Sequence, residues 1–406
     1  MFLRLICGAL PLLLSRASAH QSGDWIDAPS LPTTGRSDMT ATTIDHSAMD
    51  DARGPILIAG GCISGNLFLE DPGFHDCVEI TDELLSFVPG RGEVNGAVEG
   101  TYEVRTPMPR ARSRHTAVDV GGKLWIVGGR GSDGAVVKEI DVYDFATDKW
   151  ETPATFEAAA SDQASFTVGT SVYIVGGWPE DYSSVLSEVY IFDTAEAAVA
   201  GGGAVVTTNA SSLNVARGDI HAVVLDGYAY VVGGFTIDCS DGPLRSMERY
   251  DIANDVWEEV GELRSPRGDL ALVELNQKVY MVGGEHNNNC AKTKPFSSAF
   301  DDVEVLDVET NTWTKEQDIP FERFRFSAAP YPSDGAIYIF GGQMNLNEDN
   351  AYPVSDGVHV LFENLDDHEE VNAMGSTVGS GVASSYGGHR ITAAISFVGA
   401  TFTIFL

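Results

Sequence analysis

Six glycine pairs recur along this chain, and each pair directly follows a short run of apolar residues. The pairs are Gly60-Gly61, Gly128-Gly129, Gly176-Gly177, Gly233-Gly234, Gly283-Gly284 and Gly341-Gly342. Runs such as Val172–Val175 and Ile337–Phe340 are apolar throughout, which is typical of strands buried between two sheets. The glycines themselves permit a positive φ and a close approach of neighbouring backbone. Because the pairs recur every 48 to 68 residues, they predict one structural unit repeated along the chain.

The residues around the second glycine pair indicate the kind of repeat. Arg114–Val118 reads Arg-His-Thr-Ala-Val, Leu124–Gly129 reads Leu-Trp-Ile-Val-Gly-Gly, and Val142-Tyr143-Asp144 and Trp150 follow. This order of residues resembles the kelch family, whose repeats are about 50 residues long. The resemblance implies an all-β propeller in which four-stranded antiparallel blades surround a central channel. The unit around Gly176 departs from the pattern, because it lacks both the tryptophan and the arginine.

A second periodic feature predicts how the propeller closes. An aromatic residue that starts an outer strand is followed ten residues later by an arginine that starts the next inner strand, as in Trp257 and Arg267. Trp25 and Arg36 repeat this pattern near the N-terminus with an interval of eleven residues, and no blade lies before them. The last unit, whose third strand spans 358–362, has no such aromatic. Since pairing the strand at Trp25 into that unit leaves no open edge, we expect six blades over residues 22–364, closed by the N-terminal strand.

Both ends of the chain look like sorting signals. Residues 1–19 place Arg4 before an apolar stretch and end in Ala-Ser-Ala, which is typical of a secretory signal peptide. Residues 365–390 form an acidic and then Gly/Ser-rich linker, and residues 391–406 are uncharged. This layout predicts a GPI-anchor signal with attachment near Gly379, Ser380 or Gly381. A short tail anchor and an unanchored tail remain as alternatives, and membrane contact is expected only through this end.

Cysteine usage favours an oxidising compartment. Cys7 leaves with the signal, and the four remaining cysteines occupy loops after glycine pairs. Blade geometry favours the disulfides Cys62-Cys77 and Cys239-Cys290, although four cysteines allow three pairings. Asn209 lies in an Asn-Ala-Ser sequon and is a candidate glycosylation site. These features predict a protein at the extracellular face of the plasma membrane, or a secreted one.

The net charge of −34 makes nucleic acid and anionic lipid poor partners. Acidic clusters such as Asp301-Asp302 with Glu304 fit either calcium binding or a solvated surface. We prefer the solvated surface, because no twelve-residue loop of alternating oxygen ligands is present. His286 and Cys290 give the only metal-like spacing, which fits a polar loop better than a metal site. No metal and no cofactor are therefore predicted.

Charged residues at the start of the inner strands are the most specific candidate binding site in the sequence. One set is Arg36, Arg112, Arg217, Arg267 and Arg323, and the residues two positions later are Asp38, Arg114, Asp219, Asp269 and Arg325, with Asp162 in the remaining blade. Because residues two apart share one face of a strand, we expect one or two rings at the channel mouth. Such a rim binds carboxylates, peptide side chains or sugars, or else each arginine pairs with a neighbouring aspartate. We prefer the pairing, since buried charges are seldom left alone.

These patterns predict a monomeric, non-catalytic kelch propeller that binds a protein or glycan on its loop face. The alternative is a secreted carbohydrate-modifying enzyme, an oxidase or epimerase, on the same fold. The copper radical oxidases resemble this fold but need a cross-linked tyrosine and cysteine and two histidine ligands, for which the sequence offers no counterpart. A purely structural wall or matrix component is a third possibility.

Overall fold

The computed structural model describes residues 25–45, 54–63, 77, 79–94, 97–237, 242–287, 297–345 and 352–363. These belong to one unit, Met1–Asn364, whereas the second unit, Leu365–Leu406, lies outside the described residues, as do the expected signal peptide and tail. The described part contains one short α-helix, α1 (Thr194–Ala198), and no helix in it is long and apolar enough to cross a membrane.

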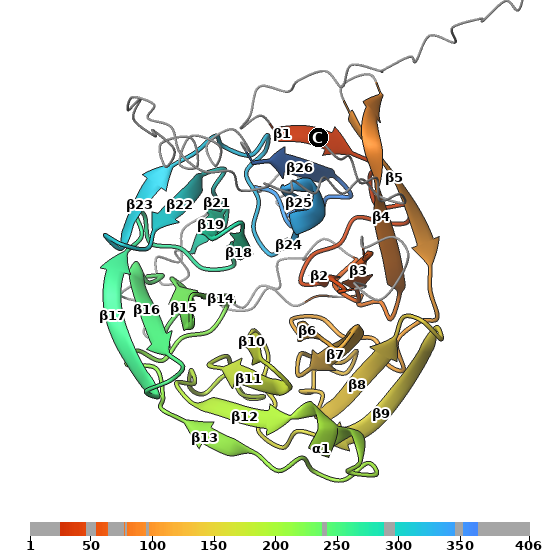
Figure 1. Cartoon of the computed structure of the whole chain (residues 1–406), viewed down its shortest axis with the longest axis vertical. Helices are drawn as coiled ribbons and strands as arrows, with labels where there is room; N and C mark the ends of the chain where they lie inside the picture. The colour runs from red at the N-terminus through yellow and green to blue at the C-terminus, as the bar shows by residue number, and fades with distance from the viewer. Residues whose placement is uncertain are drawn as a thin grey trace, which may run out of the picture. The chain divides into compact units, whose positions relative to one another are not determined.

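Antiparallel strands form four four-stranded sheets and one of eight strands, arranged radially as a β-propeller (Figure 1). The first three sheets contain β6 (Thr116–Val120), β7 (Lys123–Val127), β8 (Glu139–Asp144) and β9 (Lys149–Thr155); β10 (Ala164–Val168), β11 (Ser171–Val175), β12 (Val189–Asp193) and β13 (Thr208–Ala210); and β14 (Ala222–Leu225), β15 (Tyr228–Val232), β16 (Ser246–Asp251) and β17 (Val256–Glu262). The fourth contains β18 (Ala271–Leu275), β19 (Lys278–Val282), β22 (Val303–Asp307) and β23 (Thr312–Lys315), and a small hairpin, β20 (Glu285–Asn287) and β21 (Ser297–Ala299), lies beyond β19.

The eight-stranded sheet joins both ends of the described chain. Its order is β2 (Thr40–Thr43), β3 (Ile56–Ala59), β4 (Leu84–Val94), β5 (Ala97–Val104), β1 (Trp25–Ala28), β26 (Val358–Phe362), β25 (Ala336–Phe340) and β24 (Ser327–Tyr331). Strand β1 is antiparallel to β26, with Trp25 opposite Leu361 and Ala28 opposite Val358. It meets β5 at a single parallel bridge, Asp27 with Ala97. The first strand of the described chain therefore lies beside the last.

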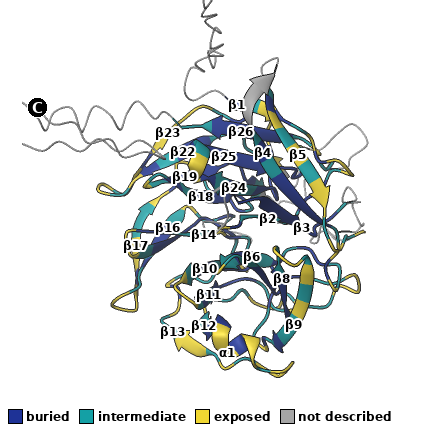
Figure 2. Cartoon of the chain, turned by 45° about the vertical axis from the view of Figure 1, so that its right-hand side comes forward, coloured by how far each residue is buried: buried dark blue, intermediate teal, exposed yellow. Residues whose placement is uncertain are grey.

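The apolar runs before the glycine pairs become the second strands of the sheets. All residues of β3 and β25 are buried, whereas most residues of the outer strand β17 are exposed or half-buried (Figure 2). In each core, side chains from neighbouring sheets pack face to face, as where Met247 of β16 and Met281 of β19 share one cluster. Burial of these faces is the main force that holds the sheets together.

Each glycine pair is a contact between neighbouring sheets. Gly60 has φ +60°, and a Cβ there would lie 2.5 Å from the carbonyl oxygen of Arg112. The next residue, Gly61, donates its N–H to that same carbonyl at 3.0 Å. The contact recurs at every pair, and the last one, from Gly342 to the carbonyl of Arg36 at 2.8 Å, joins the end of the propeller to its start. Any side chain at the first glycine of a pair would push two sheets apart.

Cys62 and Cys77 form a disulfide with a Cα–Cα distance of 5.6 Å. Cys62 follows the glycine pair after β3, so the bond closes the base of the loop between β3 and β4. Cys239 and Cys290, the second expected pair, lie outside the described residues. Asn209 is exposed on the outer strand β13.

Candidate functional site

The first set of charged residues lies inside the sheets rather than at a channel mouth. Arg36, Arg112, Arg217, Arg267 and Arg323 are at most 1% exposed. Each donates to the carbonyl oxygen of the first glycine of its own sheet, at 3.4, 3.1, 2.8, 3.1 and 3.0 Å for Gly60, Gly128, Gly233, Gly283 and Gly341. The expectation that these arginines line the channel is therefore wrong. They hold the glycine turns in place.

Each of these guanidinium groups also has a partner at the third strand of its own sheet. Arg36 pairs with Glu83, Arg112 with Asp141, Arg217 with Glu248 at 2.7 Å and Arg267 with Asp302 at 3.0 Å. Sequence reasoning expected pairing with a neighbouring blade and missed these acids. An acidic residue near the start of each of these third strands is the sequence feature that could have identified these partners.

Arg323 differs, because its partner is His359 on β26. The distance from Arg323 Nη2 to His359 Nδ1 is 3.2 Å, and since arginine only donates, Nδ1 must be unprotonated. Burial and the charge of Arg323 lower the pKa of His359 to about 4. The histidine therefore stays neutral and acts as the acceptor that a carboxylate provides in the other sheets.

In the sheet that lacks the arginine, β10–β13, a glutamine amide replaces the guanidinium group as the donor to the glycine carbonyl. Ala160 occupies the position of the arginine, and its carbonyl accepts the N–H of Gly129 at 3.0 Å. Gln163 donates from Nε2 to the carbonyl of Gly176 at 3.2 Å, the contact that arginine makes elsewhere. The weakest repeat in the sequence thus keeps the geometry of the others.

The second set of charged residues forms a closed ring, which we call the central ring. Its members are Asp38, Arg114, Asp162, Asp219, Asp269 and Arg325. The N–H of each donates to the carbonyl of the member before it, over 2.8 to 3.1 Å, and Asp38 donates to Arg325 to complete the circle. All six have φ between 51° and 58°, the left-handed region that aspartate tolerates better than most residues.

The central ring lines a cavity of 190 Å³ together with the first residues of the six inner strands, β2, β6, β10, β14, β18 and β24. His115 and His221, which the sequence places in different blades, both lie in this wall. Burial, together with the charge of Arg112, lowers the pKa of His115 to about 3; His221 is more exposed to the cavity, and desolvation by the surrounding protein lowers its pKa as well. Both imidazoles are neutral at physiological pH.

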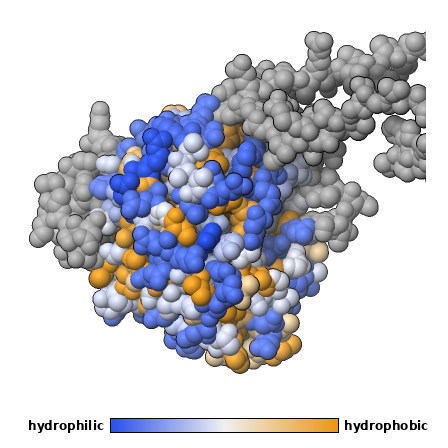
Figure 3. All heavy atoms as spheres, turned by 60° about the vertical axis from the view of Figure 1, so that its left-hand side comes forward, coloured by the Kyte–Doolittle hydropathy of each residue, from blue (hydrophilic) through white to orange (hydrophobic). Residues whose placement is uncertain are grey.

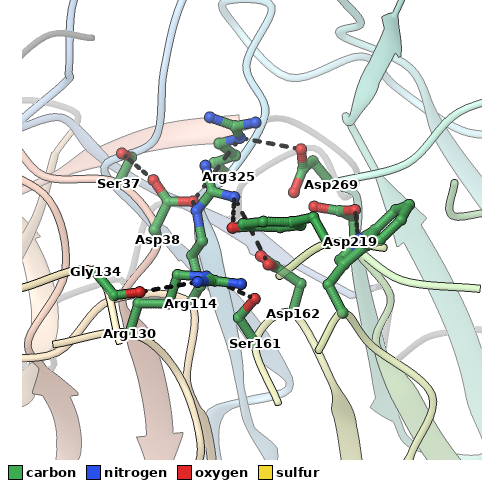
Figure 4. Close-up of polar contacts among 12 residues, drawn as sticks. Ser37, Asp38, Arg114, Arg130, Gly134, Ser161, Asp162, Asp219, Asp269 and Arg325 are labelled. Carbon is green, nitrogen blue, oxygen red and sulfur yellow. Dashed lines mark hydrogen bonds and ion pairs between the residues drawn. The ribbon is translucent and has the colours of Figure 1, made fainter. Parts of the chain in front are cut away.

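Charge is distributed unevenly around the central ring (Figure 4). Arg325 lies 3.1 Å from Asp269 and 3.8 Å from Asp38, and Arg114 lies 3.6 Å from Asp38 and 3.7 Å from Asp162. Among the described residues, Asp219 forms no ion pair, but its Oδ2 accepts a hydrogen bond from Trp178 Nε1 at 2.6 Å. Burial and then the charges of Asp162 and Asp269 raise the pKa of Asp219 well above its usual value.

Side chains of the loop between β11 and β12 contact the central ring. Trp178 lies against Gly218, where a Cβ has no room, and the Tyr182 hydroxyl is 3.3 Å from Arg114 Nη1. Arg130 anchors this loop, because its guanidinium lies 3.9 Å from the centre of the Tyr182 ring and donates to the carbonyl of Pro179 at 3.0 Å. Sequence reasoning missed all three residues, although Trp178 and Arg130 each directly follow a glycine pair.

Two aromatic side chains in the loops between second and third strands, Phe235 and Tyr352, pack against the protein. Tyr352 is 0% exposed and packs edge-to-face on Phe324 at 5.7 Å. The ring of Phe235 lies over Gly268, as Trp178 lies over Gly218. His286 lies on β20 of the small hairpin, whereas Cys290 lies outside the described residues, so the candidate metal spacing between them is not described.

Comparison with known proteins places these features in a family. The family model for the KLHDC2/KLHL20/DRC7 Kelch-repeats domain matches residues 97–284 and 164–342. Kelch-like protein 23 of Mus musculus is 23% identical over 253 residues, which are 61% of this chain and 40% of that protein. Kelch-like protein 25 of Xenopus tropicalis is 24% identical over 59% of this chain and 38% of its own length, and Kelch-like protein 35 of Mus musculus is 25% identical over 73% and 44%.

The matched region is thus about two fifths of the length of these relatives. The family model covers more than half of this chain, and its matched residues hold five of the six glycine pairs completely. The pairs, the arginines that bond to them and the radial sheets are explained together by one conclusion: the chain belongs to the kelch-repeat family.

Proposed function

We propose that this kelch propeller is an extracellular, non-catalytic module that binds a protein partner on the face where the central ring lies. The observation that carries the proposal is the set of exposed charged loops around the central ring, since the ring side chains of Asp38, Arg114, Asp162, Asp269 and Arg325 are themselves only 4 to 11% exposed. Loops from second to third strands reach the same face, since those strands end and begin there. Family membership supports the propeller, and the names of the relatives specify no partner.

Charge and polarity support a polar mode of binding. Asp133, Glu180 and Asp181 are exposed on two of these loops, beside the Arg130 contacts. The large exposed hydrophobic residues are spread over several strands and loops rather than gathered around the central ring, and the side of the molecule that Figure 3 shows also mixes hydrophobic with hydrophilic residues. A partner with basic side chains therefore fits this face better than an apolar one.

The binding proposal is tested with purified full chain against an array of extracellular proteins and an array of glycans. We expect a protein ligand whose affinity falls at least tenfold when Asp133→Arg and Asp181→Arg are combined. The matched control is Asp226→Arg, because Asp226 is exposed at the opposite end of β14. Binding to glycans alone, or equal losses in both variants, contradicts the proposal.

We further propose that the propeller has six blades, over residues 22–364, and is closed by its N-terminal strand. The eight-stranded sheet then counts as two blades, β2 to β5 and β24 to β26 with β1. The six-membered central ring and the register of β1 on β26 support this count. Ile26→Cys combined with Val360→Cys places two thiols at opposed positions. Mass spectrometry after mild oxidation is expected to find this cross-link, and its absence in folded protein contradicts closure by β1.

Location outside the cell is also a proposal, with residues 1–19 as a signal peptide and 391–406 as a GPI-anchor signal. The Cys62-Cys77 disulfide supports an oxidising compartment, and the exposure of Asn209 is compatible with glycosylation. Treatment of expressing cells with phosphatidylinositol-specific phospholipase C is expected to release the chain. A chain that stays on treated cells contradicts the lipid anchor, and an intracellular chain contradicts the location itself.

A further inference from the structure

The central ring carries more negative than positive charge. Four aspartates and two arginines give a formal charge of −2, and the arginines flank Asp38 on one side of the circle. The other side presents Asp162, Asp219 and Asp269 in succession, from the starts of β10, β14 and β18. Like charges held together in a cavity destabilise each other unless a cation or protons neutralise them.

The three carboxylates already have the spacing of a metal site. One oxygen from each lies within 4.8 Å of the other two, and Figure 4 shows the three side chains turned toward one another. Calcium binds oxygen at about 2.3–2.6 Å, so oxygens on opposite sides of one ion are about 4.6–5.2 Å apart. A set of oxygens without sulfur or nitrogen is typical of Ca²⁺ rather than Zn²⁺.

A second observation points to a ligand independently of the cluster. The Asp162 side chain is 6% exposed, and its buried Oδ2 accepts no hydrogen bond from the protein. The nearest guanidinium nitrogen, Arg114 Nη1, is 3.7 Å away, which is beyond hydrogen-bonding distance. A buried carboxylate oxygen without a donor is costly, and Asp162 lines the cavity where a cation would complete its contacts.

We propose that Asp162, Asp219 and Asp269 bind one divalent cation in the central cavity, with Ca²⁺ as the best match. The ion neutralises the ring charge of −2 and fixes the side chains of three neighbouring sheets. Its remaining ligands are water, for which a cavity of 190 Å³ has room. A second acidic cluster, Asp301, Asp302 and Asp318, is less suited, since Arg267 and Lys315 lie 3.0 and 3.2 Å from Asp302.

The test uses full chain freed of metal by a chelator and titrated with CaCl2 by isothermal titration calorimetry. We expect one Ca²⁺ per chain and at least a tenfold loss of affinity in Asp219→Asn. Asparagine keeps an oxygen that accepts the hydrogen bond from Trp178, so circular dichroism and thermal unfolding should show a folded variant. Asp226→Asn is the matched control, because Asp226 also has a positive φ, at 52°, and is exposed at the opposite end of β14. Its affinity is expected to stay within twofold of wild type.

A second measurement locates the ion without changing a proposed ligand. Tb³⁺ replaces Ca²⁺ and emits when a nearby tryptophan is excited, and Trp178 contacts Asp219 directly. At a Tb³⁺ concentration that saturates the site in both proteins, Trp178→Phe should reduce Tb³⁺ emission at least fivefold relative to wild type. No binding at millimolar Ca²⁺, unchanged affinity in Asp219→Asn, or unchanged Tb³⁺ emission in Trp178→Phe each overturns the site. Because no protein partner is present, these outcomes are independent of the proposed partner binding.

Discussion

The two sets of charged residues lie two positions apart in each repeat but differ in their surroundings and in their roles. The arginines of the first set are buried, and each has carbonyl and side-chain partners within its own sheet. Members of the central ring face a cavity, pair across sheets and have excess negative charge. The difference teaches that a charge repeated in every unit can hold the fold together, while its near neighbour remains available for a ligand. Four changes test this comparison.

The largest effect is expected from the arginine set. Arg217→Ala leaves Glu248, which is 0% exposed, without its cation, and should lower the free energy of unfolding by about 3–5 kcal/mol. Urea unfolding measures the loss. Arg245→Ala is the control, because that side chain is 48% exposed and its pair with Glu262 contributes about 1 kcal/mol or less. Similar losses in both variants would remove the distinction between buried and exposed pairs.

The second-largest loss of stability is expected at the glycine turns to which these arginines bond. Gly60→Ala and Gly121→Ala both place alanine at a positive φ, +60° and +64°, which costs about 1–2 kcal/mol. Only Gly60 also meets a carbonyl of the next sheet, and forcing a methyl into such a contact adds about 1–3 kcal/mol. The difference between the two variants in urea unfolding isolates this contact. Equal losses would show that the neighbouring sheet is not tightly packed there.

Lowering the pH should test Arg323, the arginine of the first set whose side-chain partner is a histidine and not a carboxylate. His359 has a pKa of about 4 when folded and about 6.5 when unfolded, so the unfolded state binds the proton first. The contribution of neutral His359 to the free energy of unfolding is complete above about pH 6.5. It decreases by up to about 3 kcal/mol as the pH falls to about 4. His359→Gln keeps an acceptor for Arg323 and does not titrate. Unfolding measured between pH 4 and 7 should show a smaller loss in the variant, and parallel curves would refute a neutral His359.

The smallest effect is expected at the central ring. Asp219→Asn removes one of several repelling charges and keeps an acceptor for Trp178. In the presence of a chelator, the free energy of unfolding should change by less than about 1 kcal/mol, with a gain as the favoured direction. Equilibrium unfolding in urea measures this change. A loss above 2 kcal/mol would mean that the Asp219 carboxylate is part of the structural framework.

Local patterns in the sequence predicted the strands and the family. The segment at 358–362 is a strand with those bounds, Trp25 begins β1, and the apolar runs are buried second strands. These features depend on residues close in sequence, with a period that is visible directly. The short helix α1 and the hairpin β20–β21 were missed, because each lies in a loop that varies between repeats.

The site was harder to predict, because a positive φ breaks the pattern of a strand. Arg217 and Asp219 were placed on one strand face, yet β14 begins only at Ala222, and Asp219 has φ 58°. The two side chains therefore point to different surroundings. The loop residues Trp178 and Tyr182 reach the ring from another sheet, and no local pattern reveals such a contact.

The most direct test of the account compares Arg217→Ala with Asp219→Asn in one chelator-containing buffer, by equilibrium unfolding in urea. The two residues are two positions apart in the same repeat. The arginine variant should be less stable than the aspartate variant by at least about 2 kcal/mol. Equal stabilities, or a less stable Asp219→Asn, would contradict the division between residues that hold the sheets together and residues available for a ligand.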